Sequence, residues 1–88
     1  MEQYFLISYD ITDSKLRGFF FRRLKKIAVH LQKSVFMYEG NIERVAKIEE
    51  EFKKRLTSED NVLIMPCSRS SYMNARIYSG KKPVKVLI

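Results

Sequence analysis

Residues 3–13 read QYFLISYDITD, an apolar run that ends on a carboxylate. The side chains from Tyr4 to Ile7 are apolar on both faces of an extended chain, which is typical of a central strand, and we predict a strand over residues 3–9. Asp10 follows directly. Because an unpaired buried charge is costly, Asp10 has two interpretations: it accepts hydrogen bonds at the start of the next helix, or it binds a cation.

Two amphipathic helices are predicted downstream. Thr12 or Asp13 caps the first, over residues 14–28, and the second covers residues 42–56. The apolar residues of each recur every three or four positions, as a buried helix face requires. In the first helix they are Leu16, Phe20, Leu24, Ile27 and Leu31; in the second they are Ile42, Val45, Ile48 or Glu49, Phe52 and Leu56.

The remaining elements are predicted strands. Residues 30–40, HLQKSVFMYEG, are extended, and a bend at Lys33 and Ser34 divides them into two short strands. Further strands are predicted over 61–65, stopped by Pro66, over 72–78 and, after a turn at 79–83, over 84–88. This order predicts an α+β fold, a ferredoxin-like sandwich with two helices on one face of an antiparallel sheet. The 88 residues are predicted to form one domain, residues 1–88.

The net charge of +7 is unevenly distributed along the chain. Residues 14–36 carry seven basic side chains and no acid, residues 61–88 carry five and no acid, and residues 37–60 have a net charge of −2. Such segregation favours a polyanionic partner, and we predict that the protein binds nucleic acid. The candidate contacts are a stripe on the first helix and three residues nearer the C-terminus: Lys15, Arg22 and Lys26, then Arg69, Arg76 and Lys81.

Several other classes of protein and site are disfavoured. No window approaches the roughly 18 apolar residues of a membrane span, and the N-terminus lacks the order of a signal peptide. The single cysteine, Cys67, has no internal disulfide partner, and we expect a cytoplasmic protein. Cys67 and His30, the only imidazole, do not make a zinc site, and we interpret His30 as structural. Arg69 lies among the hydroxyls of CSRSSY, residues 67–72, which either holds a phosphate or is an ordinary polar loop.

The cation interpretation of Asp10 depends on a second carboxylate. Asp13 is better placed to cap the first helix, which leaves Asp10 without an obvious structural role. Proteins usually bind Mg²⁺ through one or two carboxylates together with water and phosphate oxygens. One chain supplies a single acid at the end of this strand, whereas a two-fold dimer would bring two copies of Asp10 together.

Four segments together resemble the small endonuclease family associated with CRISPR, the partner of the CRISPR integrase in spacer acquisition. They are YDITD after the first strand, the basic helix that begins near Leu16 and Arg17, QKSVF at 32–36, and EDNVLIMP at 59–66. The match runs in order over residues 4–66. Its most specific parts are the Tyr-Asp pair and the Gln-X-Ser-Val-Phe string.

The resemblance implies a ferredoxin-like homodimer in which the C-terminal strand of each chain joins its partner's sheet. It also implies an endonuclease site, acting on RNA or DNA, in which Asp10 binds Mg²⁺ or Mn²⁺ at one site shared across the dimer axis. Tyr9, Arg17, Ser34 and Phe36 match the other catalytic motif positions of the family.

Two positions depart from the family pattern. His30 stands where many members carry Arg, and Phe19 stands where some carry a second helix Arg. Both changes remove a fixed positive charge. Some members of the family do not cleave nucleic acid and serve as a bridge between integrase dimers, which is the alternative function.

Overall fold

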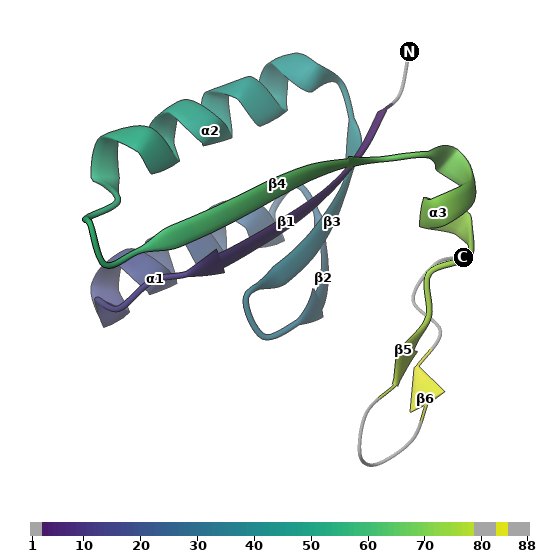
Figure 1. Cartoon of the computed structure of the whole chain (residues 1–88), viewed down its shortest axis with the longest axis horizontal. Helices are drawn as coiled ribbons and strands as arrows, with labels where there is room; N and C mark the ends of the chain where they lie inside the picture. Colours follow the sequence, from purple (N-terminus) through teal and green to yellow (C-terminus); the bar gives the residue numbers. More distant parts are fainter. Residues whose placement is uncertain (1–2, 79–82, 85–88) are drawn as a thin grey trace.

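Four antiparallel strands form the sheet of the computed structural model, which describes residues 3–78 and 83–84. They lie in the order β2-β3-β1-β4, so β1 occupies a central position between β3 and β4 (Figure 1). Two long helices, α1 and α2, connect β1 to β2 and β3 to β4. The bounds are β1 Gln3–Asp10, α1 Ser14–Lys25, β2 Val29–Gln32, β3 Val35–Gly40, α2 Ile42–Arg55 and β4 Asn61–Cys67. This order and topology confirm the predicted ferredoxin-like fold.

The main core lies between the sheet and the two long helices. Alternate residues of β1, namely Phe5, Ile7 and Tyr9, point toward the helices and belong to this core. At its centre Phe20 of α1 and Phe52 of α2 are 0% and 1% exposed, and their rings stack with centroids 4.1 Å apart. The two helices therefore cover the same face of the sheet, as the sequence predicted.

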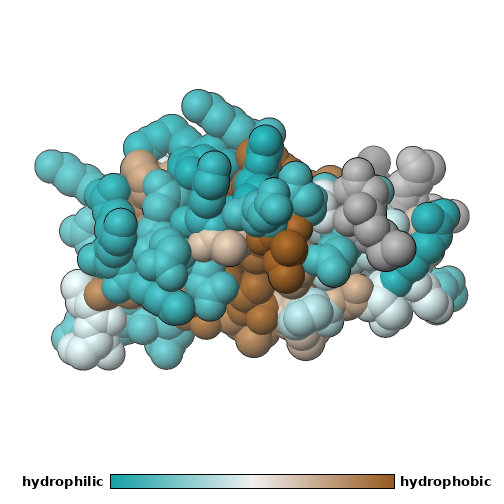
Figure 2. Space-filling model, turned by 90° about the horizontal axis from the view of Figure 1, so that it is seen from above, coloured by the Kyte–Doolittle hydropathy of each residue, from teal (hydrophilic) through white to brown (hydrophobic). Residues whose placement is uncertain are grey.

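A smaller cluster lies on the opposite face, which we call the open face of the sheet. It consists of Tyr4, Met37 and Tyr72. Tyr72 belongs to a short helix, α3 (Arg69–Met73), and its ring centroid lies 4.5 Å from that of Tyr4. Beyond it, β5 (Ile77–Tyr78) pairs with β6 (Pro83–Val84) in a ribbon that extends away from the sheet (Figure 1). Figure 2 shows hydrophobic surface gathered in one band of a mostly hydrophilic view.

Two predicted turns are confirmed in detail. The Asp13 carboxylate caps α1 by accepting a hydrogen bond from the Leu16 N–H at 2.8 Å. The bend at Lys33 and Ser34 separates β2 from β3, and Ser34 has a φ of 62°, the only positive φ of a non-glycine residue in the described part of the chain.

The end of the first helix and two predicted inner-face positions, Leu31 and Ile42, were wrong. α1 ends at Lys25, because the N–H groups of Ile27 and Ala28 both turn back to the carbonyl of Leu24. Leu31 therefore lies in β2 and packs on the open-face cluster instead of continuing the helix. Ile42, the first residue of α2, is 54% exposed, whereas Ile48, and not Glu49, is buried.

Two predicted strand boundaries were also wrong. β4 continues through Pro66, which pairs with Phe5; because β4 is an edge strand, the missing N–H of proline need not break a ladder hydrogen bond. Residues 72–78 were predicted as a strand, but Ser68 caps α3 and only Ile77 and Tyr78 are extended. Lys81 and residues 85–88, most of the predicted C-terminal strand, lie outside the described residues.

Candidate functional site

The site begins at the end of β1, where Tyr9 and Asp10 point to opposite faces of the sheet. Tyr9 belongs to the core on the helix side, whereas Asp10 is exposed and alternates with Tyr4 and Leu6 on the open face. In the sheet Asp10 lies opposite Asn61 at the start of β4. The strand period therefore separates the two residues that the family motif places together.

Tyr9 is held against the turn between β2 and β3. Its N–H donates to the Ser34 carbonyl at 3.1 Å, and its ring stacks on Phe36 with centroids 6.2 Å apart. Burial raises the pKa of the Tyr9 hydroxyl above its usual range, and the Ser34 side chain and the Arg17 charge offset part of this rise. At neutral pH the hydroxyl is therefore protonated and can donate a hydrogen bond.

Arg17 extends from the first turn of α1 back toward the end of β1. Its Nη1 donates to the carbonyl of Ile11 at 2.9 Å and to that of Thr12 at 3.3 Å. These bonds use one terminal nitrogen, which leaves the other donors of the guanidinium for an anion.

Asp60 fixes the same loop from the other side, and sequence reasoning missed it. One carboxylate oxygen accepts from the N–H and hydroxyl of Thr12, at 3.0 and 2.9 Å, and the other from the N–H and hydroxyl of Thr57, at 2.9 and 3.0 Å. The backbone N–H groups of Thr12 and Thr57 lower the pKa of Asp60 to about 2. The spacing of Thr57 and Asp60 is a local turn signal, but Thr12 lies 48 residues away and no local pattern indicates it.

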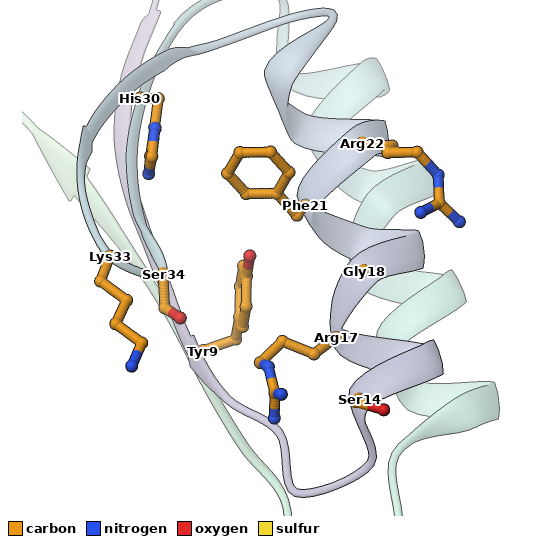
Figure 3. A pocket seen from close by; sticks show the side chains of 9 residues that line it. All are labelled: Tyr9, Ser14, Arg17, Gly18, Phe21, Arg22, His30, Lys33 and Ser34. Atoms are coloured by element: carbon orange, nitrogen blue, oxygen red, sulfur yellow. The ribbon is translucent and has the colours of Figure 1, made fainter.

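A cavity of about 510 Å³ opens between the first half of α1 and the turn after β2, and we call it the α1–β2 cavity (Figure 3). His30 borders it, and the imidazole stacks on Phe36 at 4.8 Å and meets the edge of Phe21 at 5.0 Å. The residues that line the cavity include Tyr9, Arg17, Gly18, Phe21, His30 and Ser34.

The structure therefore divides the predicted catalytic residues into two groups. Tyr9, Arg17 and Ser34 line the α1–β2 cavity, and Phe36 is fully buried beside it. Asp10 does not line this cavity. Within residues 3–78 and 83–84, no group of three or more His, Cys, Asp or Glu side chains could hold a metal ion.

The predicted nucleic-acid contacts are exposed where they are described. Lys15, Arg22 and Lys26 lie on α1 and its C-cap, and Arg22 also borders the α1–β2 cavity. Arg69 and Arg76 are exposed near α3. In the CSRSSY segment, the Ser68 hydroxyl accepts from the Ser71 N–H at 3.0 Å and so caps the short helix.

None of the helices in the described part of the chain has the length and apolar character needed to span a membrane.

Comparison with known proteins identifies the family. No curated protein sequence matches the chain. The sequence model of CRISPR associated protein Cas2 matches residues 1–75, which contain the whole four-stranded sheet, both long helices and α3. The chain therefore belongs to the Cas2 family of CRISPR-associated proteins.

Proposed function

We propose that the protein is a Mg²⁺-dependent endonuclease of spacer acquisition, active as a homodimer and partnered by the CRISPR integrase. The observation that carries this proposal is the position of Asp10, an exposed carboxylate at the end of the central strand, on the open face of the sheet. Family membership supports the CRISPR role, and the open face supplies the surface on which a second copy would bind.

The open face has the character of a surface that another molecule covers. Leu63 and Met65 of β4 are 51% and 45% exposed, and both alternate with core residues so that they point away from the helices. Large apolar side chains gathered on one face usually mark an interaction site. A two-fold axis through this face would bring the two copies of Asp10 together.

One chain supplies only one carboxylate for a Mg²⁺ ion at this place, whereas a dimer would supply two. Asp10 supplies hard carboxylate oxygens and is open to solvent, as a hydrated Mg²⁺ requires. Its neighbour across the sheet, Asn61, is also exposed and has an amide oxygen. Two copies of Asp10 would hold the ion, which when bound would polarise the phosphodiester and lower the pKa of water.

The basic residues of the chain would bind and orient the nucleic acid. Lys15, Arg22 and Lys26 are exposed along α1, and contacts of this kind hold phosphates without reading bases. They would position a strand in a register that the sequence of that strand does not determine. Binding of this type serves an enzyme and a scaffold equally well.

One observation favours the second candidate, a non-catalytic scaffold that bridges integrase dimers. Tyr9, Arg17 and Ser34 lie on the helix side of the sheet and Asp10 on the open face, so within one chain they do not surround one phosphodiester. In addition, His30 replaces a fixed positive charge. In this function Asp10 would serve dimer geometry or hold a structural ion.

The substitution Asp10→Asn separates the two functions, because it keeps the size of the side chain and removes its charge. Cleavage of labelled RNA and duplex DNA should require Mg²⁺ or Mn²⁺, stop with EDTA and fall by orders of magnitude in the variant. Dimerisation and duplex binding should stay near wild type. Glu59→Gln, which removes another exposed carboxylate from the loop before β4, is the matched control and should cleave normally.

Wild-type protein that cleaves neither nucleic acid with any divalent metal would establish the scaffold function. Equal cleavage by wild type and Asp10→Asn would instead identify a contaminating nuclease, which is a realistic risk for a small basic protein.

A further inference from the structure

The α1–β2 cavity combines positive charge with aromatic rings. Arg17, Arg22 and Lys33 border it, and no acidic residue does. Among the described residues, no carboxylate forms an ion pair with any of the three. A concave site with unpaired cations and no acid selects an anion.

The rings of the cavity indicate that the anion carries a planar group. Phe21 and His30 lie on opposite sides of the cavity mouth (Figure 3) and meet edge to face at 5.0 Å. The buried Phe36 ring contacts both, at 5.8 Å from Phe21 and 4.8 Å from His30. Lys25 Nζ lies over the Phe21 ring, 5.5 Å from its centre, and adds positive charge close to that ring. Aromatic side chains beside a basic groove are the usual platform for an unstacked nucleobase.

Two residues that line the cavity depart from ordinary backbone preferences. Gly18 is in the middle of α1, where glycine is a poor helix former, and a Cβ there would lie 3.2 Å from Arg22 Nη1. Ser34 adopts a φ of 62°, which places its side chain on the cavity wall beside Tyr9. Both residues line the cavity, and the Ser34 side chain reaches its wall only because of this backbone conformation.

From these observations we infer that the α1–β2 cavity binds one unstacked nucleotide, with its phosphate on Arg17 and Lys33 and its base against Phe21 and His30. The volume of about 510 Å³ is within the range of small-molecule sites. The nucleotide is either a free mononucleotide or the unpaired end of a strand. Because Asp10 points to the other face of the sheet, this site is separate from the proposed metal site and does not depend on cleavage.

A fluorescent nucleotide tests the inference on the full chain. The probe is 2-aminopurine riboside 5′-monophosphate, whose fluorescence changes when its base stacks, titrated in EDTA so that no metal contributes. AMP should displace it at least about tenfold more effectively than inorganic phosphate, because only AMP supplies a base to stack. A hairpin with an unpaired end that displaces the probe better than AMP identifies a strand end as the ligand; the reverse order identifies a free mononucleotide.

Variants locate the binding. Phe21→Leu should weaken probe binding about tenfold, and Lys33→Gln should weaken it while Lys47→Gln, an equal charge change on α2, does not. Inorganic phosphate that competes as well as AMP, or unchanged probe binding in both Phe21→Leu and Lys33→Gln, would overturn the inference.

Discussion

Tyr9 and Asp10 are adjacent in β1, yet their side chains lie on opposite faces of the sheet. Tyr9 is buried under α1 and bonded to the turn at Ser34, whereas Asp10 is exposed beside Asn61. A substitution at one residue can therefore leave the surroundings of the other intact. This separation makes the proposed metal site and the α1–β2 cavity accessible to independent experiments.

Dimerisation should depend on the open face. Leu63→Glu places a charge among the exposed apolar residues of β4 and should convert the dimer to a folded monomer at micromolar concentration. Ala46→Glu, at an exposed apolar residue in the first half of α2, should remain dimeric. Sedimentation velocity measures both. A wild-type chain that is monomeric in this experiment would contradict the shared Asp10 site.

Binding to duplex DNA should weaken steeply with salt and show little sequence preference. Each phosphate contact contributes about 0.9 to the slope of log K against log salt, so the triple variant Lys15→Ala/Arg22→Ala/Lys26→Ala should bind less tightly and with a shallower slope. The matched control is Arg44→Ala/Lys47→Ala/Lys54→Ala, which removes the same charge from the exposed surface of α2. Equal losses in the two triple variants would show that only net charge matters.

The Asp60 carboxylate should make stability depend on acid pH. Folding lowers its pKa from 3.8 to about 2, so its contribution is fully present above pH 3.8 and is lost as the pH falls through 2. Asp60→Asn should lower the free energy of unfolding at pH 7 and flatten its decline between pH 4 and 2. Urea unfolding across this range measures the difference. Identical pH profiles for wild type and variant would exclude this role of Asp60.

Because Ser34 has a positive φ, the β2–β3 turn should tolerate only some residue types at this position. A β-branched residue is strongly disfavoured in this conformation, so Ser34→Val should destabilise the protein by about 1–3 kcal/mol. Ser34→Gly adopts the same φ without strain and should keep or slightly raise the stability. Urea midpoints of the two variants test this, and equal destabilisation by both would point to a lost hydroxyl contact instead.

Local signals predicted most of the main sheet and both long helices. These signals are the apolar run of β1, the helical period of α2 and the Asp13 cap of α1. Each depends on a few neighbouring residues, and the folded protein contains the element that each predicted. The bend before Ser34 was also predicted, because it divides an extended segment that two antiparallel strands must share.

The wrong predictions concern residues whose conformation depends on tertiary neighbours. Pro66 is tolerated because β4 lies at the edge of the sheet, and Tyr72 is helical where it docks on Tyr4. Leu31 looks like the next turn of a helix, although the chain has already reversed at Ile27. The side chains of Tyr9 and Asp10 point to opposite faces because successive residues of a strand alternate. The family motif, in which the two residues are adjacent, suggested instead that they share one site.

The central position of β1 has a consequence for synthesis of the chain. β1 is made first, and β3 can cover one of its edges once residues 35–40 have emerged, but its other neighbour is β4, residues 61–67. At roughly 5–20 residues per second, about 1 to 5 s separate the end of β3 from the end of β4. During that time a strand as apolar as Phe5-Leu6-Ile7 has an unpaired edge on the nascent chain. Slow translation between residues 41 and 67 should therefore increase co-translational aggregation, and faster codons there should reduce it.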